Sequence, residues 1–260
     1  SEPLSPDITG LPALPDGWVW ASPVQLASIV PNALTIGPFG SNLRVSDYRS
    51  EGVPLIFVRN IRSRLFNKEN GKFVSPEKAK ELASHTTRAG DVLVTKMGEP
   101  PGDACVYPVG SPDAIITADC IKWTLHPLLG CREYFAAFIN SALGRSQIAA
   151  ITKGVAQQKV SLDRFRQIAV AVPGPEEQLL IAERLDVEAQ RLDRIYDAIA
   201  QERRRSFATR QSILKAAFSG SLVGHDAADE HASALLERIA AERGENSEAP
   251  KRGGRKKKLK

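Results

Sequence analysis

Short apolar runs, broken by glycine and proline, fill the first two thirds of the chain. They lie at residues 18–20, 53–61, 91–97, 104–109 and 114–125. Valine, isoleucine, phenylalanine and tryptophan dominate these runs, and such side chains favour β-strands. Glycine-rich turns such as Gly90-Asp91 separate them. The pattern therefore predicts a set of short strands.

Helical patterns lie among these strands. Ser75 and Pro76 open a predicted short helix at 75–84, as N-cap and first helical residue. Apolar residues recur on one side of a predicted helix at 131–151, and Ser161 is expected to cap a short turn before a strand at 168–172. Strands and helices together predict an α+β fold, a globular mixed domain at 17–173 that follows a proline-rich linker at 1–16.

A long helix is predicted next, over residues 174–220. Its apolar residues alternate at spacings of four and three, which is the heptad pattern of a coiled coil. The seam consists of Ile181, Leu185, Glu188, Leu192, Ile195, Ile199 and Glu202. A lone helix would expose this seam, so we expect it to pair with another helix. The alternative is a helix that folds back on its own domain.

The C-terminal end divides into a short helical segment at 221–245 and a basic tail at 246–260, which we expect to be disordered. Seven of the last ten residues are lysine or arginine and none is acidic. Without these seven, the 35 basic residues of the chain become 28, against 30 acidic ones. The net charge of +5 is therefore a property of the tail, and by itself it says little about DNA binding by the folded part.

Cysteines and apolar runs indicate the compartment. Cys105, Cys120 and Cys131 have no CxxC spacing, which is typical of reduced, buried thiols in a cytoplasmic protein. The four histidines are scattered, so no zinc site is expected. No apolar run approaches the roughly 18 residues of a membrane helix, and residues 1–6 lack the basic-then-apolar layout that is typical of a signal peptide. The first residue is not methionine, so a processed chain and a fragment both remain open.

The sequence contains no catalytic motif that we could find. No acidic residue stands two positions before a lysine, as the PD-(D/E)xK nucleases require, and no Asn-Pro-Pro-Tyr-like tetrapeptide for methyl transfer is present. No GxxxxGK[ST] phosphate loop occurs either. These absences favour a binding or scaffolding role over an enzyme.

Two basic clusters remain once the tail is set aside. One, at 41–64, holds five arginines against Asp47 and Glu51; the other, at 145–166, holds five basic residues against Asp163. Arginine, asparagine and glutamine read base edges, while lysine and serine hold phosphates. A solvated surface is the alternative, and it is the simpler interpretation of any single residue. Loop position and chemistry select as DNA-binding candidates Ser41, Arg44, Asn60, Lys96, Lys153, Gln157, Gln158 and Lys159.

Several segments, in this order and spacing, resemble the specificity subunit of type I restriction–modification systems. They are Leu-Pro-Asp-Gly-Trp at 14–18, Gly-Pro-Phe-Gly-Ser-Asn-Leu at 37–43, the stretch 52–61, Gly-Asp-Val-Leu at 90–93, and the stretches 158–165, 173–178 and 211–220. The resemblance implies one target-recognition domain followed by one conserved helix. A whole subunit of this family has two such units, with the helices antiparallel and each domain reading half of a split DNA target.

The resemblance also implies partners. Such a subunit is not catalytic; it recruits methyltransferase subunits, which methylate adenines, and motor–nuclease subunits. S-adenosylmethionine, ATP and Mg²⁺ would then belong to those partners and none to this chain. This sequence has only one unit. It is either half of a longer subunit or a half-subunit that forms a homodimer through its helix, with a preference for a palindromic split site in double-stranded DNA.

Two other functions stay open at this point. One is a DNA methyltransferase that carries its own recognition domain, which would bind S-adenosylmethionine by itself. The other is a coiled-coil interaction protein without a role on DNA, for which the loop lysines and glutamines would be dispensable.

Overall fold

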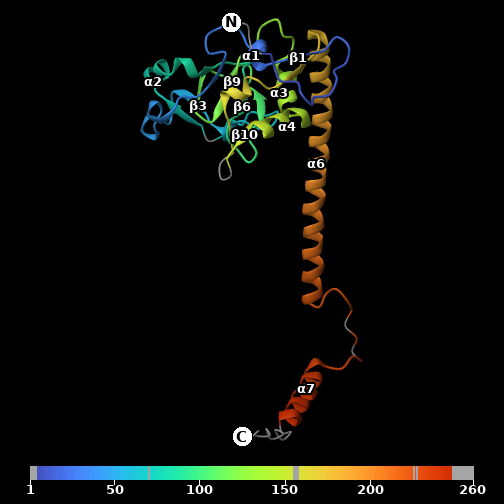
Figure 1. Ribbon diagram of the computed structural model, residues 1–260. Coiled ribbons are helices and arrows are strands. Elements are labelled where there is room, and N and C mark those ends of the chain that lie inside the picture. Colours follow the sequence, from blue (N-terminus) through green and yellow to red (C-terminus); the bar gives the residue numbers. More distant parts are fainter. Residues whose placement is uncertain (1–4, 70, 155–157, 225, 227, 248–260) are drawn as a thin grey trace, which may run out of the picture. The chain divides into compact units, whose positions relative to one another are not determined.

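The computed structural model describes residues 5–247, except 70, 155–157, 225 and 227. The chain forms two compact units, residues 1–191 and 192–260, and the division falls inside one long helix, α6 (Pro175–Phe218). The predicted mixed α+β fold with a long helix is confirmed (Figure 1). Among the described helices, none has the length and hydropathy to cross a bilayer.

Two four-stranded sheets form the first unit. The first sheet has the order β2-β9-β6-β7 and is antiparallel throughout. The second has the order β4-β3-β8-β5, in which β3 and β8 run parallel. The bounds are β2 (Leu34–Ile36), β3 (Val53–Ile56), β4 (Lys72–Val74), β5 (Thr86–Thr87), β6 (Val92–Thr95), β7 (Ala104–Val106), β8 (Ala114–Ile116) and β9 (Cys120–Trp123).

Two further strand pairs join distant parts of the chain to this unit. β1 (Val19–Ala21) pairs with β12 (Val170–Val172), and β10 (Thr152–Lys153) pairs with β11 (Lys159–Val160). The short helices are α1 (Pro23–Leu26), α2 (Pro76–Glu81), α3 (Arg132–Asn140), α4 (Ala142–Ile151) and α5 (Leu162–Phe165). In the second unit, α7 (Ala232–Ser247) follows α6.

Serine caps decide where several helices begin. Ser75 and Ser161 accept backbone N–H groups from Lys78 and Arg164, as predicted for α2 and α5. The prediction of one helix at 131–151 was wrong, because Ser141 splits it into α3 and α4. Its hydroxyl donates to the Phe138 carbonyl oxygen (2.7 Å) and accepts the Gly144 N–H (3.1 Å), so it serves both helix ends.

Two predicted strands are also shorter than their apolar runs. The run 114–125 forms two strands, β8 and β9, because the chain turns at Thr117, whose N–H and hydroxyl both donate to the Ile56 carbonyl oxygen. The run 53–61 ends as a strand at Ile56 and continues as a 3₁₀ turn at Val58–Asn60.

The main core lies between the antiparallel sheet and helices α3 to α5. Trp123 packs edge-on against Phe135 and Phe165, and all three rings are fully buried. Burying each such ring stabilises the fold by roughly 1.5–3 kcal/mol. The Trp123 indole N–H donates to the Pro23 carbonyl oxygen (3.0 Å), so no polar group of this ring is left without a partner.

The three cysteines are free and buried, as predicted. Burial raises the pKa of Cys105 and of Cys120 to about 12. Because the thiolate is the reactive form, we expect iodoacetamide at pH 8 to label these two at least about 100-fold more slowly in the native protein than in urea. Peptide mass spectrometry after timed labelling measures this, and equal rates would contradict the placement of both side chains.

The same pKa shifts predict that stability falls at high pH. The folded-state pKa of each thiol lies above the unfolded value of 9.0, so the unfolded chain loses these protons first. The stabilisation is complete below pH 9 and is lost as pH rises toward 12, by up to about 1.4 kcal/mol per pH unit for each thiol. Burial lowers the pKa of Lys122, which opposes this trend. Urea unfolding at pH 8 to 10 gives the net slope, and a Cys105→Ala/Cys120→Ala variant should lose the thiol contribution.

Candidate nucleic-acid interface

Two lysines face each other on the β10–β11 hairpin. Lys153 and Lys159 are directly paired in the antiparallel register, and both are exposed. Side chains at directly opposite positions lie on the same face, and like charges there are destabilising in the absence of an anion. The hairpin therefore presents two adjacent ammonium groups to the solvent.

A third lysine lies beside this hairpin, at the end of strand β6 of the antiparallel sheet. Lys96 follows β6, and its carbonyl oxygen accepts the Val160 N–H (2.9 Å), while Met97 forms an isolated bridge with Lys159. The Lys96 ammonium donates to the Ala118 carbonyl oxygen (3.4 Å) and lies 5.2 Å from the centre of the Phe39 ring. Backbone segments that are far apart in the sequence thus meet here, with the Lys96 and Lys159 side chains on alternate sides of the pairing.

The loop that carries Phe39 is held by a close backbone contact. A side chain at Gly37 would place its Cβ 2.1 Å from the carbonyl carbon of Thr117, so only glycine fits there. Phe39 is 62% exposed, although it is a large apolar residue. Ser41, also exposed, follows it on the 3₁₀ turn Gly40–Asn42.

We call the residues of these neighbouring segments the lysine surface, a name for their shared chemistry and for the backbone pairing that brings the segments together. Its members are Phe39, Ser41, Lys96, Lys153, Gln158 and Lys159. Lysine ammonium and serine hydroxyl groups are phosphate ligands, an exposed aromatic ring is a stacking surface for bases, and a glutamine amide can read a base edge. The surface has the chemistry of a nucleic-acid contact, and five of its six residues were candidates from the sequence.

Phe39 was missed by the sequence analysis. It lies in the Gly-Pro-Phe-Gly-Ser-Asn-Leu segment at 37–43 and entered the sequence interpretation only as part of a resemblance. An apolar residue at the tip of a glycine-flanked turn, beside basic residues, is the signal that could have revealed it.

The other candidates lie elsewhere. Asn60 is only 4% exposed, and its amide accepts the Phe57 N–H (2.9 Å) and donates to the carbonyl oxygens of Asn67 (2.8 Å) and Glu69 (3.4 Å). Both polar atoms of the Asn60 amide are thus bonded to the backbone of a loop and are buried. The structure gives no support to base reading by Asn60. Arg44 is exposed at the 3₁₀ turn Val45–Asp47. Gln157 lies outside the described residues.

The second basic cluster is partly neutralised inside the protein. Arg145 pairs with Asp103, and it also donates to the Ser63 hydroxyl (2.8 Å) and the Asn140 amide oxygen (3.1 Å). Arg166 pairs with Asp163 (3.1 Å). The charge count of this cluster therefore overstated the charge that a ligand would meet, which is concentrated on the hairpin lysines.

The long helix α6 continues from the compact first unit into the second. In the part of α6 that belongs to the first unit, Gln178, Ala182 and Ala189 are buried, and Ile181 packs against the main core. The start of the predicted seam thus faces its own domain, as the fold-back alternative expected for the whole helix. Further along, the seam residues are exposed: Leu192 is 53% and Ile199 59% exposed.

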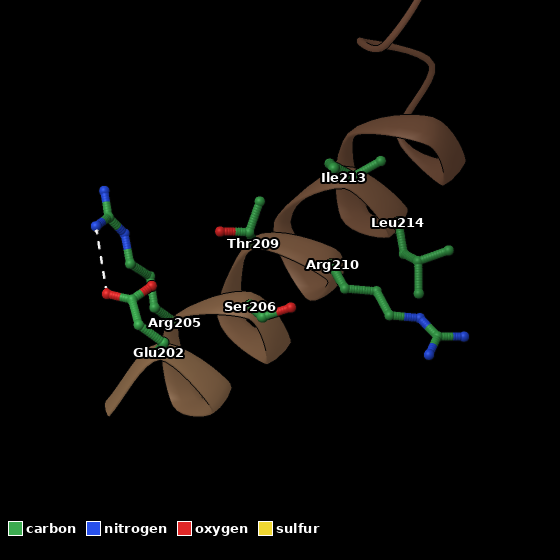
Figure 2. A pocket seen from close by; sticks show the side chains of 7 residues that line it. All are labelled: Glu202, Arg205, Ser206, Thr209, Arg210, Ile213 and Leu214. Atoms are coloured by element: carbon green, nitrogen blue, oxygen red, sulfur yellow. Dashed lines mark ion pairs between the residues drawn. The ribbon is translucent and has the colours of Figure 1, made fainter. Parts of the chain in front are cut away.

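Exposed apolar residues continue to the end of α6. They include Ile195, Tyr196, Phe207, Ile213, Leu214 and Phe218. Two shallow hollows lie along this part of the helix, one of them lined by Glu202, Arg205, Ser206, Thr209, Arg210, Ile213 and Leu214 (Figure 2). Hollows between helical side chains receive the side chains of a second helix in coiled coils. The seam glutamates pair along the helix, Glu188 with Arg184 (3.1 Å) and Glu202 with Arg205 (3.9 Å).

No cluster of His, Cys, Asp and Glu suited to a metal ion is present in the described part of the chain. The lysine surface and the exposed stripe of α6 are thus the features that a function must explain.

Solved structures share this fold. One match is a chain from a study titled "Structural basis underlying complex assembly and conformational transition of the type I R-M system", with a TM-score of 0.62 and 18% identity. Another is the HsdS subunit from Thermoanaerobacter tengcongensis, with a TM-score of 0.55 and 19% identity. Each match covers 82% of this chain, and 49% and 48% of the respective matched chain.

At this level of identity the likeness concerns the fold. The fold is that of an HsdS-type chain, and this chain spans about half the length of the structures it matches. No family model matches the sequence, and no curated protein does so either.

Proposed function

We propose that this chain is a DNA-specificity component of a type I restriction–modification system, equivalent to half of a specificity subunit. The observation that carries the proposal is the likeness to about half of the HsdS fold, with one globular domain and one long helix. The lysine surface supports it, because it gives the domain a site with the chemistry of DNA binding. The chain itself performs no catalysis in this proposal.

The residues of the lysine surface would have different roles, according to their chemistry. Lys96, Lys153 and Lys159 would hold backbone phosphates and so orient the domain on the duplex. Gln158 and Phe39 would contact bases, by hydrogen bonding and by stacking. Methyltransferase and motor–nuclease subunits would bring S-adenosylmethionine, ATP and Mg²⁺ and carry out the chemistry, in the cytoplasm.

The exposed stripe of α6 supports self-association. A helix with an apolar stripe that long needs a partner, and a second copy of the same helix offers a matching one. An antiparallel homodimer would hold two recognition domains at a fixed separation. Its two-fold symmetry would favour a palindromic target split by a spacer of fixed length.

Reconstituted methylation tests the proposal. The chain mixed with a methyltransferase subunit of a type I system and labelled S-adenosylmethionine should direct methyl transfer to adenine at one defined sequence. The same mixture without the chain should give at least about 100-fold less transfer at that sequence, because the methyltransferase would lack its recognition domain. Methyl transfer without sequence preference would contradict the proposal, and binding of S-adenosylmethionine by the chain alone would favour an enzyme.

A further inference from the structure

The first turns of α6 are fixed to the recognition domain by a buried glutamine. Gln178 is 1% exposed, and its side-chain oxygen accepts the Cys131 N–H (3.3 Å), while its amide nitrogen donates to the Pro173 carbonyl oxygen (2.9 Å). A buried polar side chain costs stability unless it is bonded on both sides, as this one is. One side chain thus links the start of α3, the end of β12 and the helix α6.

Two neighbouring contacts strengthen this joint. A Cβ at Gly130 would lie 2.4 Å from the Pro175 carbonyl oxygen, so the loop before α3 touches the first residue of α6 without space between them. The Trp18 indole N–H also donates to the Glu177 carboxylate (3.1 Å), which ties the residue before β1 to α6. We call Trp18, Gly130 and Gln178 the joint residues.

We propose that the joint residues restrict the DNA target to a single spacer length, because they fix the angle between the recognition domain and the start of α6. This inference rests on the proposed function, in which two domains read half-sites whose separation is set by the paired helices. The paired helices can fix the separation of the two half-sites only if each domain is held rigidly at the end of its helix. None of the joint residues belongs to the lysine surface, so their substitution should widen or shift the tolerated spacing and leave the half-site sequence unchanged.

Apolar side chains of the same volume would bury the start of α6 equally well, but they would not fix its angle to the domain. Hydrogen bonds have narrow ranges of distance and direction, whereas apolar contacts tolerate sliding. Gln178→Ala should therefore loosen the joint, and Gly130→Ala should displace it, because the added methyl group overlaps the Pro175 carbonyl group. Trp18→Phe removes one N–H donor and keeps an aromatic ring.

Selection from a random duplex DNA pool with the full-length chain tests the inference. The wild-type chain should enrich a split motif with a single spacer length. Gln178→Ala should enrich the same half-sites with at least three spacer lengths, so that the preference for the best spacer over its neighbours falls roughly fivefold to tenfold. Gly130→Ala should shift the preferred spacer. Gln190→Ala is the matched control, since this exposed amide bonds only to Asp186 on the same helix, one turn earlier.

The outcomes separate the two proposals. If the wild-type chain enriches no split motif, the proposed function fails and this inference fails with it. If the wild type enriches one but the joint variants keep its single spacer, only the inference is wrong. A variant that loses the half-sites while its circular dichroism spectrum is unchanged would also contradict it. Should Gln178→Ala not fold, Trp18→Phe at the more exposed side of the joint gives the same test.

Discussion

The double substitution Leu192→Lys and Ile199→Lys is expected to convert the proposed homodimer into a monomer. Both side chains are more than half exposed in the single chain and neither belongs to its hydrophobic core, so the substitutions leave that core intact. In a paired helix they would place four lysine charges per dimer in an apolar seam, where an unpaired buried charge costs about 3–5 kcal/mol. A cost of this size for each buried charge opposes pairing of the two helices.

Light scattering measures the result directly, as a fall from the mass of two chains to the mass of one. Val187→Lys is the matched control, because Val187 is equally exposed but lies about 120–140° around the helix from the two seam residues at 100° per residue. The control should remain dimeric. A dimer that survives the double substitution, with circular dichroism showing intact helices, would contradict the assignment of the stripe as the pairing surface.

Replacing both hairpin lysines, Lys153→Ala with Lys159→Ala, should lower DNA affinity roughly 10- to 100-fold at about 0.1 M salt. Each lysine that neutralises a phosphate contributes about 0.9 to the slope of log affinity against log salt. The variant should therefore have a shallower salt dependence as well as weaker binding. Because the two lysines are direct cross-strand neighbours, their removal should leave the free energy of unfolding unchanged or slightly raised.

Fluorescence anisotropy with a short duplex, recorded between 50 and 300 mM salt, gives both affinity and slope. Lys80→Ala is the control, since Lys80 is exposed on α2, and its loss should leave affinity and slope within about twofold of the wild type. A double variant that binds with the affinity and salt slope of the wild type would remove the lysine surface from the DNA contact.

Local signals in the sequence predicted α6 and the starts of α2 and α5. A serine at the N-cap and an uninterrupted run of helix-forming residues act within a few positions, so they are visible without a structure. The break at Ser141 was not visible. Gly144 packs directly on the Phe138 carbonyl group, and that contact depends on how α3 and α4 cross.

The lysine surface shows the same difference between local signals, which the sequence reveals, and long-range contacts, which it does not. Lys153 and Lys159 were candidates because they lie close together in the sequence. Their meeting with Lys96, and the position of Phe39 beside that lysine, depend on a long-range pairing between the end of β6 and β11. The burial of Asn60 has a more local cause, because its partners at Asn67 and Glu69 come from the loop that it closes. Side-chain chemistry selects candidates, but the non-local pairing decides which of them face the solvent.

The central claim is that two copies of this chain read the two halves of one split DNA target. Modification-sensitive sequencing tests it most directly, on DNA from cells that express this chain as the only specificity component together with a methyltransferase subunit. The account predicts methylated adenine in a split motif whose two halves are inverted repeats, separated by a spacer of one length. Methylation in an undivided or asymmetric motif, or none at a defined sequence, would contradict it.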